Sequence, residues 1–161
     1  AKGSSVEPAE DIIASLEIRS DNRRYPKEYI PVRVLEINEI NQAYDWASSY
    51  IKKALKKDFT ATGRDLDHMQ KVIDGGKLNP RQTEAWQALG LTFGTILVNE
   101  MDGMDWVTVI DGSEEYPALR FADTDLVVAP LNLFADKVRR GEPCVVKKEF
   151  ERIKNEVERR L

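Results

Sequence analysis

Residues 106–129, WVTVIDGSEEYPALRFADTDLVVA, decide the fold class of this chain. They contain three short runs rich in strand-forming residues: Trp106–Ile110, Pro117–Phe121 and Leu126–Ala129. Asp111–Gly112–Ser113 has the composition of a tight turn, and Ala122–Asp125 forms the second connection. Consecutive strands with such short connections predict an antiparallel meander of three strands.

The chain before this segment repeats its apolar residues with a helical period. The pattern predicts helices from Asn38 through the lysines at 52–57, over Asp65–Asp74, and from Asn79–Pro80 to about Met101. Asn79 and Gln82 are placed to form a box-like cap where the third helix begins.

Two glycines, Gly90 and Gly94, lie one turn apart in the third predicted helix. Glycine weakens a helix by ~1 kcal/mol per position relative to alanine. Their spacing therefore predicts that another backbone packs closely against this face, with a ligand at the same place as the alternative.

The remaining segments complete an α+β fold. We expect a short helix over Ala9–Glu17, an extended stretch to Ile37, and helices over Leu131–Arg140 and Val146–Leu161. The prediction is a single domain of helices packed on a small three-stranded antiparallel sheet. It has a mostly helical N-terminal half (1–78), a helix plus sheet (79–142) and a C-terminal helical segment (143–161).

Composition excludes several classes of protein. With 161 residues, 42% of them apolar and a net charge of −4, the chain suits one domain with its own core. No stretch approaches the ~18 consecutive apolar residues of a membrane span. Cys144 and His68 are single residues of their type, so we expect no disulfide, no zinc cluster and no cofactor. No signal peptide is recognisable; we expect a cytoplasmic protein, with the periplasm as the alternative because the chain starts at Ala1.

Negative charge is concentrated between residues 95 and 130. This segment has eight acidic residues against the single basic residue Arg120. Such a segment disfavours nucleic acid and favours a basic partner, although solvated strand ends and loops are the simpler interpretation. The predicted recognition surface consists of Asp102, Asp105, Asp111, Glu114, Glu115, Asp123 and Asp125.

Trp46 and Tyr50 form a second candidate surface for a partner. They lie four residues apart beside the apolar stripe of the first long helix, and so share a helix face. Half-exposed aromatic residues of this kind anchor protein interfaces, with an ordinary core position as the alternative.

Other reactive residue types lack the companions that their chemistry needs. Asp65 and His68 share a helix face but lack further metal ligands. Asp111–Glu115 does not have the spacing of a calcium loop, and Cys144 lacks an adjacent base. Carboxylate pairs for acid–base catalysis could be drawn from four residues, Glu100, Asp105, Asp123 and Asp125, but they would need burial or close approach, which the sequence does not show. We therefore expect a protein that is not an enzyme.

A set of short motifs resembles a known bacterial family. In order, the motifs are Trp86–Gly94, Leu97–Glu100, Trp106–Asp111, Pro117–Arg120, Pro130–Leu131 and Arg139–Glu142. Together they resemble the domain of unknown function 3806 family, in which a buried glycine-containing helix precedes a "WVxVxD" strand and a "PALR" strand. The resemblance covers residues 79–142 and implies a small bacterial protein without assigned catalytic residues. Some similar folds are immunity proteins that protect against toxins.

These observations predict a non-catalytic protein-binding domain. By resemblance, it would act as a bacterial immunity protein that neutralises a basic toxin enzyme by occlusion. The alternative is a small-molecule or cation-binding domain, weakly enzymatic, with acidic loop ends over the Gly90–Gly94 helix. A housekeeping structural subunit is the third possibility.

Overall fold

The computed structural model describes residues 16–18 and 27–161. Its elements are β1 (Leu16–Ile18), β2 (Glu28–Pro31), α2 (Val34–Leu55), α3 (Asp65–Asp74), α4 (Thr83–Glu100), β3 (Met104–Asp111), β4 (Glu114–Phe121), β5 (Leu126–Val128), α5 (Leu133–Arg139) and α6 (Val146–Glu158). The predicted α+β class is confirmed, as are the three strands of the meander and the bounds of α3.

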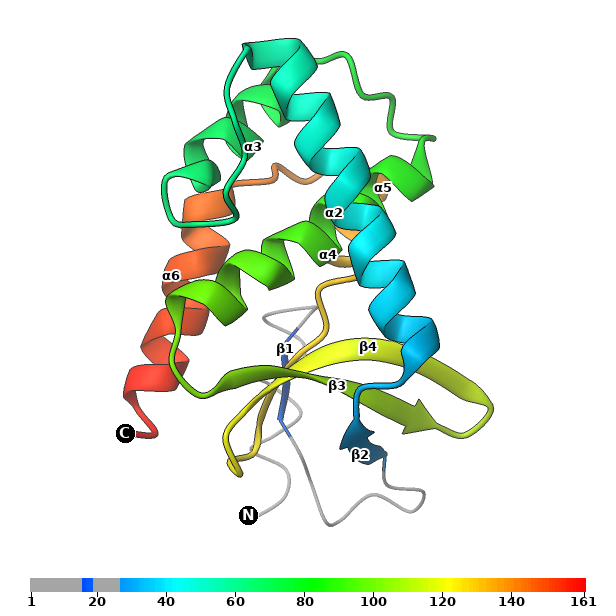
Figure 1. The fold of residues 1–161 in the computed structure, drawn as a ribbon, viewed down its shortest axis with the longest axis vertical. Coiled ribbons are helices and arrows are strands. Elements are labelled where there is room, and N and C mark those ends of the chain that lie inside the picture. Colours follow the sequence, from blue (N-terminus) through cyan, green and yellow to red (C-terminus); the bar gives the residue numbers. More distant parts are fainter. Residues whose placement is uncertain (1–15, 19–26) are drawn as a thin grey trace.

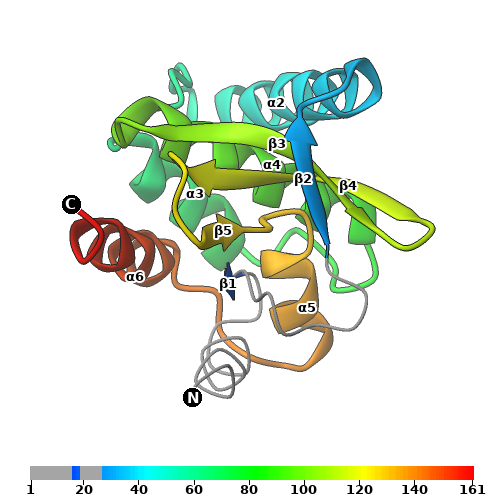
Figure 2. The same cartoon turned by 90° about the horizontal axis from the view of Figure 1, so that it is seen from below.

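The sheet is antiparallel and has five strands in the order β1-β5-β4-β3-β2, rather than the predicted three (Figure 2). The two additional strands, β1 and β2, lie at the edges and have three and four residues. Such short strands leave little pattern in the sequence, and Pro31 in β2 argues against a strand unless the strand lies at an edge. The predicted helix over Ala9–Glu17 falls outside the described residues except at Leu16 and Glu17, which belong to β1.

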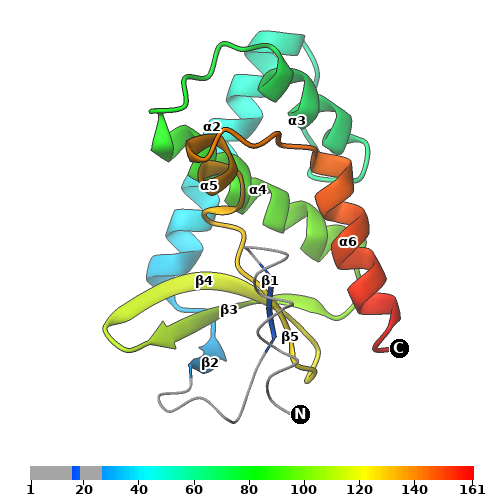
Figure 3. The same cartoon turned by 180° about the vertical axis from the view of Figure 1, so that it is seen from behind.

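The helices gather on one side of the sheet, with α4 at their centre (Figure 1). Helix α4 packs against α2 and α5 and also touches β3 and β4. Its apolar residues are buried around most of its circumference, including Leu89, Phe93 and Leu97, which are fully buried. From behind, α5 and α6 are seen to complete the helical layer (Figure 3).

Gly90 and Gly94 are packing positions, as predicted. A Cβ added at Gly90 would lie 2.2 Å from the carbonyl oxygen of Pro130, and one at Gly94 would lie 2.6 Å from the Trp106 ring. These distances leave no space for a ligand against the two glycines. The absent side chains let the Pro130 segment and β3 approach α4 closely.

Two helix starts differ in detail from the prediction. Only half of the predicted cap between Asn79 and Gln82 forms: the Asn79 N–H donates to Gln82 Oε1 (2.7 Å), whereas Asn79 Oδ1 accepts from the Arg81 N–H (2.8 Å), and α4 begins only at Thr83. Helix α2 begins at Val34, four residues before the predicted Asn38. The β-branched residues at 32 and 34 suggested an extended chain, whereas the buried Glu36 bonds to β3 and holds the first turn in place.

The two faces of the sheet are both apolar. Met104, Leu119 and Val128 join the main core beneath the helices. Val109, Ala118 and Val127 form a second, fully buried cluster on the other face. Within the described residues, no helix has the length and apolar character needed to cross a bilayer.

Candidate functional site

The seven predicted recognition carboxylates divide into two groups. Pairing of β3 with β4 runs from Met104 opposite Phe121 to Asp111 opposite Glu114, so the ribbon separates its two ends by about 24 Å. Four of the residues, which we call the turn-end carboxylates, lie at the end where β3 begins: Asp102, Asp105, Asp123 and Asp125. The other three, the hairpin-tip carboxylates, lie at the opposite end: Asp111, Glu114 and Glu115. The seven residues predicted to form the recognition surface therefore do not all lie together.

Backbone hydrogen bonds bring two turns together at the turn end. The Met104 N–H donates to the Met101 carbonyl (3.1 Å), which closes one turn, and the Thr124 N–H donates to the Phe121 carbonyl (3.0 Å), which closes the other. The Ala122 N–H donates to the Gly103 carbonyl (2.7 Å) and joins the two. The turns carry Asp102 and Asp123, so these two side chains belong to adjoining segments.

Three of the four turn-end carboxylates form no ion pair within the described part of the chain. Asp102, Asp105 and Asp123 are exposed, and none of them has an ion-pair partner among the described residues. Asp125 differs, because Arg160 Nε lies 2.7 Å from its Oδ1. Arg120 lies opposite Asp105 in the strand register, and its Nε donates to the Thr124 carbonyl (3.1 Å), so one cation lies among these carboxylates. The turn end therefore presents three carboxylates that form no ion pair with the described residues, beside the Asp125–Arg160 pair.

The hairpin tip is partly neutralised by the protein itself. Arg33 Nη1 lies 2.8 Å from Glu115 Oε1, and Lys27 Nζ lies 3.9 Å from Asp111 Oδ2. Gly112 has φ +63°, which the tight turn between the strands requires. Residues 111–115 thus form a hairpin tip, as expected.

Trp46 and Tyr50 pack together on α2, as their spacing predicts. Their rings are stacked, with centroids 5.0 Å apart and planes 15° apart. Tyr50 is half-buried against the main core, whereas Trp46 is 37% exposed to solvent. The two residues therefore differ in accessibility: Tyr50 belongs largely to the core, and Trp46 is available to a ligand.

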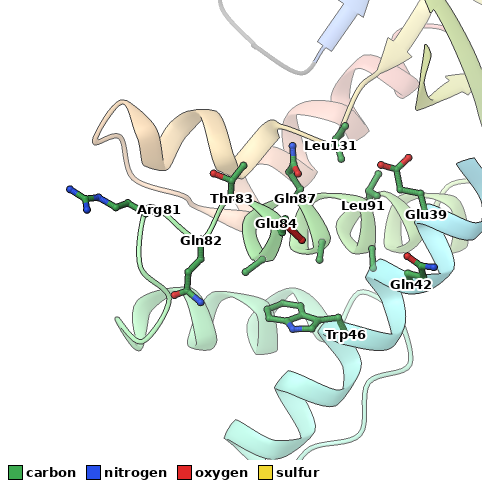
Figure 4. Close-up of a pocket in the computed structure, with 13 residues that line it drawn as sticks. Glu39, Gln42, Trp46, Arg81, Gln82, Thr83, Glu84, Gln87, Leu91 and Leu131 are labelled. Atoms are coloured by element: carbon green, nitrogen blue, oxygen red, sulfur yellow. The ribbon is translucent and has the colours of Figure 1, made fainter. Parts of the chain in front are cut away.

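Trp46 forms one wall of a groove of about 610 Å³ between α2 and the N-terminal half of α4. Figure 4 shows Glu39, Gln42 and Trp46 projecting from α2 beside this part of α4. The lining residues are Glu39, Gln42, Ala43, Trp46, Arg81, Gln82, Thr83, Glu84, Ala85, Gln87, Ala88, Leu91 and Leu131. Burial, and to a smaller extent the charge of Glu36, raise the pKa of Glu39 above its usual value.

Two glutamines of the groove are oriented by hydrogen bonds. Gln82 Oε1 accepts from the Asn79 N–H (2.7 Å), so its amide NH₂ remains a donor. Gln87 Nε2 donates to Asn132 Oδ1 (2.8 Å), which leaves its Oε1 as an acceptor. The sequence pattern identified Trp46 but did not indicate that these two glutamines lie near it, because only the packing of α2 on α4 brings them together.

Asp65 and His68 form a structural pair. Asp65 is fully buried and accepts hydrogen bonds from His68 Nδ1 (2.7 Å), the Thr60 N–H (2.8 Å) and the Thr62 N–H (3.3 Å). Its carboxylate thereby fixes the loop before α3. Among the described residues, no group of three or more His, Cys, Asp or Glu side chains is arranged to hold a metal ion.

Cys144 lies in a second groove of about 710 Å³, between α3 and the segment joining α5 to α6. The thiol is buried, and burial is the main reason that its pKa is raised to about 11. Gln70 joins the two segments, accepting from the Val146 N–H (2.8 Å) and donating to the Cys144 carbonyl (2.9 Å). A protonated, buried thiol is a poor nucleophile.

The carboxylates considered for acid–base catalysis have separate surroundings. Glu100 accepts from the Gly63 N–H (3.0 Å), and Asp125 pairs with Arg160. Neither groove is lined by Glu100, Asp105, Arg120 or Asp123. Two buried acidic residues that the sequence did not indicate are Glu36, which accepts from Thr108 Oγ1 (2.8 Å), and Glu149, whose Oε2 lies 3.6 Å from Lys137 Nζ.

Comparison with known proteins identifies relatives without a known activity. The family model described as Domain of unknown function (DUF3806) matches residues 65–150. This match confirms the resemblance seen in the sequence and extends beyond residues 79–142 at both ends. A second model, Domain of unknown function (DUF3805), matches residues 1–41.

One solved structure shares the fold. It is a crystal structure of a protein from Bacteroides thetaiotaomicron VPI-5482, with 42% sequence identity and a TM-score of 0.74. The alignment covers 93% of this chain and 55% of that one, so the chain spans little more than half the length of this relative. No curated protein matches the chain.

Proposed function

The chain belongs to the DUF3806 family, and from this premise we propose that it is a non-catalytic protein-binding domain for a basic protein partner. The observation that carries the proposal is the hydrogen bond from Ala122 N–H to the Gly103 carbonyl. By joining two turns, it brings Asp102 and Asp123 to the end of the ribbon where Asp105 lies in β3; all three carboxylates are exposed and form no ion pair with the described residues.

The fixed geometry of these turns favours recognition of another macromolecule. Short side chains on hydrogen-bonded turns lose little conformational entropy when a partner binds. Uncompensated negative charges attract a cationic surface over about 8 Å at physiological salt, and the attraction weakens as salt is added. Binding through the turn end should therefore be salt-sensitive.

The side chains most suited to catalysis are buried or hydrogen-bonded within the protein, where they stabilise the fold. This supports a non-catalytic function. Asp65 and His68 bond to each other and to the loop before α3. Cys144 is buried, and its pKa is raised to about 11, mainly by burial. Glu36 is buried against Thr108.

In its more specific form, the proposal is that the partner is a toxin enzyme and that the domain acts as an immunity protein by occlusion. The resemblance noted from the sequence and the negative turn end support this form. Coexpression with a toxic product of the neighbouring reading frame tests it. Relief of toxicity by the chain would support a role as an immunity protein. Relief that persists after loss of the turn-end charges would contradict occlusion through the turn end.

The general proposal is tested by capture from lysate of the source cell with matched charge variants. One variant removes three turn-end charges: Asp102→Asn, Asp105→Asn and Asp123→Asn. The control removes three hairpin-tip charges: Asp111→Asn, Glu114→Gln and Glu115→Gln. Far-UV circular dichroism and urea midpoints establish that both variants are folded.

We expect the unaltered chain and the hairpin-tip variant to capture the same basic protein at low salt and to release it at high salt. The turn-end variant should bind that protein roughly tenfold more weakly, since three exposed charge pairs each contribute modestly. Equal capture by the two variants would reject the turn end as the binding surface. Capture of no basic protein at either salt concentration would reject the proposed function.

A further inference from the structure

We propose that the groove between α2 and α4 is a separate binding site for a neutral saccharide, which stacks on Trp46 and bonds to the glutamine amides around it. This site is distinct from the turn-end carboxylates, none of which lines the groove. The inference does not depend on the proposed protein-binding function.

The groove has the dimensions of a small-ligand site. Its volume of about 610 Å³ lies within the range of roughly 300–1,000 Å³ that is typical of such sites. Ala43, Ala85 and Ala88 line its floor, and their small side chains leave space between the two helices. From Thr83 to Leu91 the floor runs about 12 Å along α4, a length suited to a disaccharide.

Trp46 provides a preorganised aromatic platform. Tyr50 stacks on it at 5.0 Å and is itself packed against the core, so the indole has lost much of its freedom before a ligand arrives. A sugar ring offers a face of C–H groups that packs on an aromatic surface, while its hydroxyl groups point outward at the rim. Binding to a fixed ring loses less entropy than binding to a free one.

The rim of the groove is suited to hydroxyl groups. Gln82 presents a free amide donor, Gln87 presents a free acceptor, and Gln42 carries both. Hydroxyl groups both donate and accept, so a ligand rich in them can use each of these groups. Because Gln82 and Gln87 are held by Asn79 and Asn132, their orientation is set by the fold.

The charges in the groove disfavour an anionic ligand. Glu39 and Glu84 outnumber Arg81, so an anion would meet net repulsion, whereas carboxylates readily accept hydrogen bonds from hydroxyl groups. Burial, followed by the charge of Glu36, raises the pKa of Glu39 above its usual value.

Peptide ligands fit the groove less well. Both long walls are helices whose backbone groups bond internally, so an extended peptide finds no sheet edge to extend. An amphipathic helix needs a continuous apolar stripe, but more than half of the lining side chains are polar or charged.

The test is titration of the folded 161-residue chain with maltose, cellobiose, lactose and N,N′-diacetylchitobiose, followed by the NMR resonances of the indole N–H groups and glutamine side-chain amides. The variants are Trp46→Ala, Trp46→Phe and Gln42→Ala. The matched control is Asn41→Ala, an exposed amide that neighbours Gln42 in sequence but does not line the groove. Thermal unfolding of each variant reports whether it is folded.

We expect at least one disaccharide to shift the resonances of Trp46, Gln42 and Gln87 in a saturable manner. Trp46→Ala should weaken binding by about tenfold, Gln42→Ala by roughly three- to tenfold, and Trp46→Phe less than Trp46→Ala. Asn41→Ala should bind as the unaltered chain does.

Three outcomes would overturn the inference. The first is that no disaccharide shifts the groove resonances. The second is that binding persists unchanged in Trp46→Ala and Gln42→Ala. The third is that a proline-rich or a basic peptide, titrated in parallel, occupies the groove while the sugars do not. None of these outcomes bears on capture of a partner by the turn-end carboxylates.

Discussion

Gly90 has the tightest backbone approach of the glycines in the described chain. Replacement by alanine would place a methyl group 2.2 Å from the Pro130 carbonyl oxygen, where backbone atoms must move apart. Although alanine favours helix by ~1 kcal/mol, we expect Gly90→Ala to lower the free energy of unfolding by about 1–3 kcal/mol in urea titrations. Gly75→Ala is the control, since its nearest contact is the Lys71 carbonyl at 3.3 Å. Equal effects of the two substitutions would contradict this packing role.

Asp65 should make stability depend on pH. Desolvation by itself would raise its pKa, but hydrogen bonds from His68, Thr60 and Thr62 outweigh it and lower the pKa below the usual value. As the pH falls, the unfolded chain therefore takes up this proton before the folded chain does, and the stabilisation that Asp65 provides above about pH 4 is lost.

Asp65→Asn tests this pH dependence. At pH 7 it should lower the free energy of unfolding by about 1–3 kcal/mol, and at pH 3 the difference from the unaltered chain should shrink. Urea titrations at both pH values measure the effect. Asp67→Asn, at the exposed pair with Lys147, is the control and should change stability little. A difference between wild type and Asp65→Asn that grows toward pH 3 would have the wrong sign.

Cys144 should react slowly with thiol reagents. With its pKa raised to about 11, mainly by burial, roughly one thiol in a thousand is ionised at pH 8, and the sulfur is also shielded from solvent. Labelling with an aromatic disulfide reagent, followed by absorbance, should be slow for the folded chain and fast in concentrated urea. Rapid labelling without urea would show that the thiol is accessible and would contradict its burial.

Helix α2 is fastened to β3 through a buried side-chain bond. Thr108 Oγ1 donates to Glu36 Oε1 (2.8 Å) and accepts from the Arg33 N–H (3.0 Å), so one hydroxyl serves both the helix start and the strand. Thr108→Val should lower the free energy of unfolding by about 1–3 kcal/mol, because it leaves a buried carboxylate without its donor. A double-mutant cycle with Glu36→Ala, which removes the acceptor, should give a smaller combined loss than the sum of the single losses. Strict additivity would mean that the bond contributes nothing.

Elements with a strong local signal were predictable, and those that depend on distant partners were not. The bounds of α3 follow from its apolar stripe and the glycines after it, and the β3–β4 hairpin follows from its strand formers and Gly112. Strand β2 contains only four residues and a proline, so it exists through its pairing with β3. The early start of α2 likewise depends on Thr108, far away in the sequence.

The arrangement of the acidic residues depends on strand register over the full length of the ribbon. Clustering in the sequence suggested one surface, but a long hairpin places residues that are near in sequence at opposite ends. Trp46 was predictable from its helical spacing to Tyr50, whereas the groove beside it requires the packing of α2 on α4. Local patterns therefore identified candidate residues but not the surfaces that they form.

The most direct test of the proposed function is carboxylate labelling of the chain with and without its captured partner, using a carbodiimide and glycine ethyl ester and mass spectrometry of the peptides. Because Asp102, Asp105 and Asp123 are exposed and form no ion pair with residues 16–18 or 27–161, all three should label readily in the free chain. We expect the partner to protect these three carboxylates from labelling, while Glu114 at the hairpin tip labels as before. Protection at Glu114 with continued labelling of Asp102, Asp105 and Asp123 would contradict this expectation.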